Sequence, residues 1–390
     1  MPTFQRPPLE LAEIVRRHGP RIDEHLSGAQ RRILRDIATC RTAALGGHVE
    51  SCDHCHHQRI AYNSCRNRHC PRCQASAAAR WMADRAKELL PVEYFHVVFT
   101  LPDTFNALAL ANKRIVYGVL FDAVAQTLLQ VAANPKHLGA RIGFMGILHT
   151  WGQNLSLHPH VHCIVPGGGL SGGGVSADGK WVNCRPGFFL PVRVLSKVFR
   201  GKFIELLKRA RGRGLLVGAD DDRRFDQLLN AAVRHDWVVY AKPPFGGAER
   251  VLHYLARYTH RVAISNHRLV SFKDDQVSFR WKDYAAGSKQ KVMTVSADEF
   301  LRRFLIHVLP KGLVRIRHFG LFANRKRSAS LRRCRFLLNV AEPPLQPAPT
   351  SQIKCPLCSE LMLVIERFNI LQLLAPPPRT APIKPRLDSS

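Results

Sequence analysis

Residues 157–165 read LHPHVHCIV, an apolar and β-branched run that predicts a strand. Successive side chains of a strand point to opposite faces of a sheet, so His158, His160 and His162 share one face. Imidazole suits divalent transition ions, and a pair of such ligands leaves coordination positions open, whereas a structural zinc site is closed by four protein ligands. This face is therefore a candidate metal site. The alternative is an exposed strand that is merely rich in histidine.

Composition indicates a folded protein with a polyanionic partner. The chain has 390 residues, 46% of them hydrophobic and 22% charged, which suits two or three domains with cores. Its 58 Lys and Arg against 29 Asp and Glu give a net charge of +29. Nucleic acid is the first candidate partner and an anionic membrane surface is the alternative. No apolar run approaches the ~18 residues of a spanning helix, so we expect no membrane segment.

Cysteine usage indicates metal binding rather than disulfides. The opening MPTFQRPPLELAEIV lacks a signal-peptide core, which predicts a reducing cytoplasm for the 11 cysteines. Residues 9–39 predict two helices with a break at Gly19-Pro20. The next segment has little apolar periodicity, so a metal ion would have to supply its folding free energy. It contains eight candidate ligands: Cys40, His48, Cys52, Cys55, Cys65, His69, Cys70 and Cys73.

Two CxxC motifs give the strongest single signal. Cys52/Cys55 and Cys70/Cys73 have 14 residues between them, a spacing that lets two such pairs close a tetrahedron around Zn²⁺. Cys40, His48, Cys65 and His69 form a possible second zinc set, and the sharing of ligands between one or two ions stays open. A thiol-redox role for CxxC would need a βαβ context. Arg66 and Arg68 add positive charge, which suits phosphate contact or a solvated surface.

The middle of the chain alternates helices and strands. We expect helices at 75–90 and 107–132, a strand at 94–100, and a strand at 142–153 joined by a turn at 154–157 to the histidine strand. His149, Trp151 and Gln153 then share a face, and either His149 or Gln153 completes the metal site.

Two glycine-rich stretches match nucleotide-binding motifs, and we interpret both as hairpin turns rather than nucleotide-binding loops. No helix follows Gly167, Gly169 and Gly172, and Trp181 occupies the Ser/Thr position of a Walker-type loop, so no nucleotide cofactor is expected.

The second half adds a helix with two tyrosines and a basic segment. We expect helices at 195–211 and 226–233, a strand at 237–241 and a helix at 247–258. The last helix puts Tyr254 and Tyr258 about one turn apart on one face. This spacing also suits ordinary packing of the two tyrosines. Residues 301–340 contain no acidic residue, and their basic residues, among them Arg325, Lys326 and Arg327, favour phosphate binding. Cys355 and Cys358 form a CxxC without evident partners, for which Cys334 is a weak candidate. Proline-rich residues 343–349 predict a linker, and the tail from Pro376 predicts disorder.

Four stretches together resemble one family. NSCRNRHCPRCQ, HTWGQNLSLHPHVHCIVPGGG, YLARYTHRVAISNHRL and FGLFANRKR occur in this order over most of residues 40–340. They are similar to the insertion sequence 91 family of bacterial rolling-circle transposases, members of the HUH endonuclease superfamily with two tyrosines. The resemblance implies an α+β fold with an antiparallel sheet and flanking helices, and an N-terminal zinc-binding module.

The resemblance also implies roles for individual residues. His160 and His162 would hold a catalytic Mg²⁺ or Mn²⁺ with a polar third ligand, for which we choose Gln153 over His149. Tyr254 and Tyr258 would be the nucleophiles that form 5′-phosphotyrosine with single-stranded ends of a mobile element. Arg257 and Arg261 would favour phenolate or bind phosphate.

The expected domains are 1–39 (helices), 40–90 (zinc-binding, DNA contact), 91–300 (endonuclease), 301–342 (basic DNA-binding extension) and 343–390 (linker, CxxC and tail). Two alternatives remain: a plasmid replication initiator or relaxase of the same superfamily, and a non-enzymatic zinc-dependent DNA-binding protein. The DNA target, the order in which the tyrosines act and the oligomeric state are not determined by the sequence.

Overall fold

The computed structural model describes residues 9–172, 179–242, 263–284, 286–342 and 353–369. Within these residues, helices pack on sheets whose neighbouring strands are antiparallel. The predicted α+β class is confirmed.

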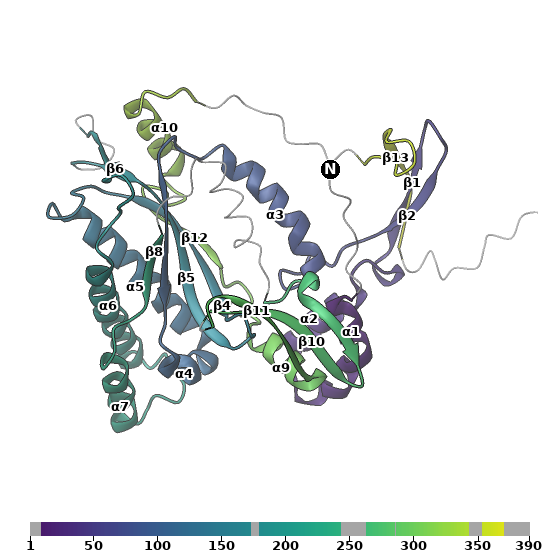
Figure 1. Ribbon diagram of the computed structural model, residues 1–390, viewed down its shortest axis with the longest axis horizontal. Coiled ribbons are helices and arrows are strands. Elements are labelled where there is room, and N and C mark those ends of the chain that lie inside the picture. The colour runs from purple at the N-terminus through teal and green to yellow at the C-terminus, as the bar shows by residue number, and fades with distance from the viewer. Residues whose placement is uncertain (1–8, 173–178, 243–262, 285, 343–352, 370–390) are drawn as a thin grey trace, which may run out of the picture.

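A five-stranded sheet with the strand order β12-β4-β5-β3-β8 forms the centre of the larger body (Figure 1). Its strands are β3 (Tyr94–Thr100), β4 (Gly143–Trp151), β5 (Leu157–Pro166), β8 (Val239–Lys242) and β12 (Ile316–Gly320). The predicted strands at 94–100, 142–153, 157–165 and 237–241 are confirmed, with small shifts at their ends. β12 lies within the segment that we expected to be a separate basic extension. That segment therefore contributes an edge strand to the central sheet.

One face of the sheet is wholly apolar. Every second residue of β3 and β5 enters the main hydrophobic core, including Phe95, Phe99 and Val161. Helices α5 and α6 cover this face, and Figure 1 shows them on one side of the sheet together with α7. Their bounds are α5 (Lys113–Ala133), α6 (Val192–Gly212) and α7 (Asp222–Val233). The helices predicted at 195–211 and 226–233 are confirmed.

The helix predicted at 107–132 is interrupted at Asn112. Its parts are α4 (Asn106–Ala111), which follows the short helix η3 (Asp103–Phe105), and α5. The buried Asn112 side chain accepts from the Val217 backbone N–H at 2.7 Å and donates to the Val217 carbonyl at 3.0 Å. A side chain that binds another segment's backbone on both sides explains the break, because it fixes a non-helical backbone at this position.

Helix α5 is apolar enough to cross a membrane by length and composition, so the expectation that no apolar run reaches this length was wrong. In the most apolar stretch of this helix, 67% of the residues are buried inside the protein. The apolar surface of α5 therefore packs against the sheet and α6.

The opposite face of the sheet is divided between an apolar end and a histidine-rich end. Tyr94, Met145 and Ile164 pack with Trp81 of α3 (Pro71–Ala86). This helix matches the one predicted at 75–90. The imidazoles of β4 and β5 occupy the other end of the same face, which leads to the site described below.

A second body, which the sequence analysis did not predict, contains a three-stranded sheet with the order β11-β10-β9. The N-terminal helices pack with α9 and this sheet in one hydrophobic cluster, which includes Ile14, Phe279 and Phe300. Its elements are α1 (Leu11–His18), η1 (Gly19–His25), α2 (Gly28–Thr39), η4 (Asn266–Arg268), β9 (Leu269–Lys273), β10 (Gln276–Asp283), β11 (Lys289–Ser296) and α9 (Ala297–Ile306). The predicted break at Gly19-Pro20 is confirmed, because α1 gives way there to a 3₁₀ helix.

A third, smaller sheet with the order β13-β1-β2 projects from the molecule at the right of Figure 1. We call it the arm; its strands are β1 (Gly47–Cys52), β2 (Gln58–Tyr62) and β13 (Met362–Phe368), and η2 (Ala43–Leu45) precedes it. β13 comes from the region expected to be a linker and tail. Residues 47–62 and 362–368, which are far apart in the sequence, therefore meet in this sheet.

The glycine-rich segment contains the two strands of a hairpin, as predicted. β6 (Gly168–Leu170) pairs with β7 (Trp181–Asn183). Leu170 lies in a small apolar cluster with Leu331 and Cys334 of α10 (Arg327–Leu337). Cys334 is therefore part of a packing cluster separate from the one that contains Cys355.

Candidate active site and metal centres

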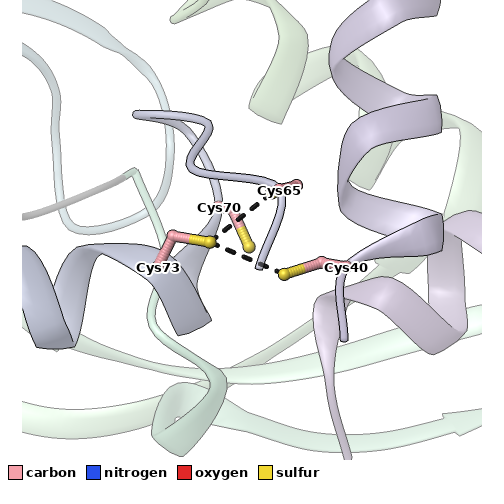
Figure 2. A group of neighbouring side chains, drawn as sticks. All are labelled: Cys40, Cys65, Cys70 and Cys73. Carbon is pink, nitrogen blue, oxygen red and sulfur yellow. Dashed lines mark hydrogen bonds between the residues drawn. The ribbon is translucent and has the colours of Figure 1, made fainter. Parts of the chain in front are cut away.

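Four cysteines meet where the N-terminal helices join α3 (Figure 2). Cys40 follows the last turn of α2, Cys70 precedes α3, and Cys73 lies in its first turn. Cys65 comes from the preceding loop, and all four sulfur atoms lie within 4.8 Å of one another. We call Cys40, Cys65, Cys70 and Cys73 the interior cysteine cluster.

The interior cysteine cluster fits a tetrahedral zinc ion. The Sγ of Cys73 lies 3.5 Å from the Sγ atoms of both Cys40 and Cys65, and Zn–S bonds of ordinary length set sulfur atoms about 3.8 Å apart. The four thiols share their hydrogens: contact with Cys65 lowers the pKa of Cys40 to about 7 and contact with Cys40 holds the pKa of Cys73 far below its usual value, whereas contact with Cys40 raises the pKa values of Cys65 and Cys70. Thiolates are the form that binds metal.

The structure groups the candidate zinc ligands differently from the pairing that the CxxC spacing suggested. Cys52 and Cys55 do not join Cys70 and Cys73, because β1 and β2 carry them into the arm. The proposed second set is divided as well: Cys40 and Cys65 belong to the interior cysteine cluster, and its two histidines do not.

Each of those two histidines has other surroundings. His48 lies on β1, where its Nε2 is 2.9 Å from a carboxylate oxygen of Glu50. His69 is enclosed by protein, and burial lowers its pKa to about 3, with Arg68 as the next contributor. Spacing along the chain did not determine which ligands meet, because strands and loops intervene between them.

The two arginines expected to contact DNA near the zinc module differ. Arg68 donates to the carbonyl oxygens of Leu313, Pro310 and Leu309 at 2.7, 2.8 and 3.1 Å, so its charge fastens this segment to the zinc module. These carbonyls take up three of its five N–H donors, and its assignment to DNA contact stays a prediction. Arg66 is exposed, and its role stays a prediction.

His149, His160 and His162 form a second candidate metal site, which we call the histidine cluster. Their donor nitrogens lie within 4.8 Å of one another. His149 of β4 stands directly opposite His160 of β5, and His162 follows two residues later on the same face. His149 and His162 are buried, whereas His160 is partly exposed. Three imidazoles with an accessible member leave coordination positions for an outside ligand.

Hydrogen bonds fix the orientation of two of these rings. The Nδ1–H of His160 donates to the carbonyl of His158 at 2.6 Å, which turns its Nε2 toward a metal. The Nδ1 of His162 lies 2.8 Å from the Nε2 of His96 on β3, and the two rings stack at 5.0 Å. Burial lowers the pKa of His96 to about 4, so its ring is neutral, and one of these two facing nitrogens donates its hydrogen to the other.

His96 was not identified from the sequence, although the pattern contains a signal. β3 pairs with β5 so that His96 is opposite Ile164 and Val98 is opposite His162, which puts all four side chains on one face. Strand pairing between distant segments is what a single sequence leaves open.

The structure brings His149 to the position for which we chose Gln153. The pairing of β4 with β5 shifts register between His149 and Trp151, and β4 ends at Trp151. Gln153 lies beyond the strand, and its side-chain nitrogen is 3.5 Å from the hydroxyl oxygen of Tyr284. A bulge and a strand end therefore lie between His149 and Gln153, so strict alternation does not extend to Gln153.

Side chains from the second body hold the turn between β4 and β5. Arg303 donates to the carbonyl of Asn154 at 3.2 Å, and Arg268 donates to the carbonyl of Gln153. His307 donates to the carbonyl of Leu155 at 3.1 Å, and burial lowers its pKa to about 4. The second body therefore positions the hairpin that carries the histidine cluster.

Tyr254, Tyr258, Arg257 and Arg261 lie outside the described residues. Of the three basic residues predicted near the C-terminal helix, Arg325 and Lys326 are exposed. Arg327 forms an ion pair with Glu88 at 3.3 Å.

Two family models match the chain. One, described as "Putative transposase", matches residues 143–329, which include the histidine cluster. The other, described as "Transposase zinc-binding domain", matches residues 14–101, which include the interior cysteine cluster. The chain is a transposase of the insertion sequence 91 family. It therefore acts on DNA and carries a zinc-binding domain, as predicted.

Two relatives agree with this assignment. The transposase is 53% identical over 386 residues to "Putative transposase y4qJ" of Sinorhizobium fredii, covering 92% of this chain and 96% of that relative. It is 30% identical over 310 residues to "Transposase for insertion sequence element IS801" of Pseudomonas savastanoi pv. phaseolicola, covering 75% and 72%. No solved structure matches the chain.

Proposed function

We propose that this transposase cuts and rejoins single-stranded DNA at the ends of a mobile element by the rolling-circle route, through 5′-phosphotyrosine. The observation that carries the proposal is the histidine cluster, because it provides three imidazoles on neighbouring strands of one sheet, with His160 partly exposed. The match to the family and the zinc-binding domain favour transposition over plasmid replication as the outcome of this chemistry.

The donor set fits a divalent ion, with Mn²⁺ favoured over Mg²⁺ because imidazole is a softer ligand than carboxylate. Such an ion supplies Lewis-acid polarisation of the scissile phosphate. His149, His160 and His162 would hold it, and His96 would keep His162 in the ligating tautomer.

We assign the nucleophiles to Tyr254 and Tyr258. The described residues on either side of their segment start and end near the histidine cluster: Lys242 pairs with His96, and Ala263 packs in the same apolar cluster as Trp151, whose ring stacks on His149. Residues 243–262 join these two points and contain both tyrosines. Arg257 and Arg261 belong to the same segment and would bind phosphate.

The reaction keeps the energy of the phosphodiester bond in the covalent phosphotyrosine intermediate. The tyrosine oxygen forms a bond to phosphorus, the bond from phosphorus to the 3′ oxygen breaks, and that oxygen leaves as a free 3′-OH. A 3′-OH can later reverse the step, so no nucleotide cofactor is required. Two tyrosines allow one DNA end to stay attached while the second is cut. The reaction would take place in the bacterial cytoplasm, where the DNA is.

The test is covalent trapping. Labelled single-stranded DNA from the element's ends, incubated with protein and Mn²⁺, should give an adduct that survives denaturing electrophoresis and maps to Tyr254 or Tyr258 by mass spectrometry. Each single Tyr→Phe variant should retain some nicking, and the double variant none. An adduct on any other residue would refute the assignment of the nucleophiles.

A further inference from the structure

The arm contains a second group of four cysteines, Cys52, Cys55, Cys355 and Cys358, which we call the arm cysteine cluster. Their sulfur atoms lie within 4.8 Å of one another. The Sγ atoms of Cys52 and Cys358 are 3.4 Å apart, and those of Cys55 and Cys355 are 3.5 Å apart. Half of this cluster comes from each end of the chain, and the matched zinc-binding domain ends at residue 101, before the second pair.

The two CxxC motifs of the arm have the same local structure. After Cys52, the backbone N–H of His56 donates to the Cys52 carbonyl at 2.9 Å; after Cys355, the N–H of Ser359 donates to the Cys355 carbonyl at 2.9 Å. His56 and Ser359 both have positive φ, 53° and 66°. The same left-handed residue directly after each second cysteine bends both turns toward one centre.

A second pair of backbone hydrogen bonds is also the same in the two CxxC turns. The N–H of Cys52 donates to the carbonyl of His57 at 3.0 Å, and the N–H of Cys355 donates to the carbonyl of Glu360 at 2.7 Å. Two loops with no similarity beyond CxxC have adopted one hydrogen-bonded form. A chance meeting of thiols would not require this repetition, whereas two pairs of ligands around one tetrahedral ion do.

We propose that the arm cysteine cluster binds a second zinc ion, which fastens residues 353–369 to the N-terminal module. Besides the cysteines, Met362 is the buried side chain of the small apolar cluster here, with Ile353 partly buried against it. Such a core is too small to hold a three-stranded sheet together, so metal binding supplies the missing free energy.

The arm is not built to grip phosphate. Residues 47–62 and 353–369 contain three basic residues against four acidic ones, in a chain of net charge +29. The basic residues are Arg59, Lys354 and Arg367, and the acidic ones are Glu50, Asp53, Glu360 and Glu366. Four thiolates around Zn²⁺ add further negative charge. The second zinc ion therefore joins residues 47–62 to residues 353–369 and leaves DNA binding to other surfaces.

Zinc content tests the proposal directly. The full-length protein should contain two zinc ions, and the Cys355→Ser/Cys358→Ser variant should contain one, with the salt dependence of DNA binding unchanged. Cys184→Ser, at a half-buried thiol outside both clusters, is the control and should contain two. A single zinc ion in the unmodified protein, or two in the double variant, would overturn the proposal.

A second experiment stays informative if the double variant does not fold. A protease site replaces part of residues 343–352, and an affinity tag follows Ser390. After cleavage, the fragment that begins near Ile353 should stay bound to the rest of the protein and should be released by a zinc chelator. Separation before the chelator is added, or continued binding after all zinc is removed, would show that metal does not fasten the arm.

Discussion

Trp151 connects two candidate metal sites of opposite design. It belongs to the hydrophobic cluster that contains Cys40, Cys70 and Cys73, and its ring stacks on His149 with 4.7 Å between centroids. The interior cysteine cluster has four soft ligands, and Cys40 and Cys70 are 0% and 1% exposed, so a metal there would be closed to solvent. The histidine cluster has three imidazoles and a partly exposed member.

This difference in ligands and exposure suits the two clusters to different roles, one in stability and the other in the reaction. A closed thiolate site would stabilise the packing of α3 against α2 of the second body, whose residues hold the hairpin of the histidine cluster. An open imidazole site would have room for a phosphate oxygen. In the proposed mechanism a structural site thus lies beside a reactive one, and fixing the first helps to position the second.

The largest expected effect concerns the third imidazole. His149→Ala should lower the rate of single-strand cleavage on the order of 1000-fold, because a Lewis acid contributes several kcal/mol to the transition state. Gln153→Ala should change the rate by less than about threefold, since Gln153 lies beyond β4. DNA binding should be unchanged in both variants. The measurement is the rate of cleavage with Mn²⁺ for each variant. A larger loss of rate in Gln153→Ala than in His149→Ala would mean that Gln153 is the third metal ligand.

The second largest effect is expected at the interior cysteine cluster. Cys73→Ser should lower the free energy of unfolding by about 4 kcal/mol or more through loss of a bound metal, and soluble yield should fall with it. Cys184→Ser, outside both cysteine clusters, should cost less than about 1 kcal/mol. Thermal unfolding and elemental zinc analysis provide the two measurements. Unchanged zinc content and unchanged stability in Cys73→Ser would contradict a structural role for the interior cysteine cluster.

Local patterns predicted much of this architecture. Alternation predicted the strands around His160 and the face that His160 and His162 share, and apolar periodicity predicted α6 and α7. These are properties of short segments, in which the backbone period alone decides which side chains lie together.

Long-range partners were not predictable from the same information. Cys355 pairs with Cys55 across most of the chain, and His96 meets His162 only because β3 and β5 are neighbours. Strand pairing depends on how the whole chain folds, so CxxC spacing near Cys70 suggested the wrong partners. A register shift between His149 and Trp151 interrupts the alternation on which the choice of Gln153 was based, and alternation cannot anticipate such a shift.

A smaller effect is expected at His96, which touches the ligand rather than the metal. His96→Ala should raise the Mn²⁺ concentration for half-maximal cleavage about 10- to 100-fold, because His162 loses the partner that fixes its tautomer. His96→Gln should recover part of this loss, since its amide oxygen can accept the same hydrogen bond. The rate at saturating Mn²⁺ should stay near that of the unmodified protein. A rate loss that saturating Mn²⁺ does not restore would mean that His96 does more than position His162.

The smallest effect concerns charge, where the two regions differ again. Arg68, beside the closed site, binds protein carbonyls, whereas Arg325 and Lys326 are exposed. Removing both exposed charges should make the plot of log K against log [salt] for single-stranded DNA less steep by about 1.4, at about 0.7 per phosphate. Adding Arg327→Ala should contribute less than one further charge, because Arg327 already pairs with Glu88.

A matched pair of exposed cations tests the location of that surface. Lys208 on α6 and Arg223 on α7 are exposed on the helices that cover the apolar face of the sheet, opposite the face with the histidine cluster. Lys208→Ala/Arg223→Ala should leave the slope within about 0.3 of the unmodified protein, since phosphates bound for cleavage lie on the other face. If the Lys208→Ala/Arg223→Ala variant makes the plot less steep and the Arg325/Lys326 variant does not, DNA binds across α6 and α7 instead. The histidine cluster would then have to receive its substrate from the side of these helices.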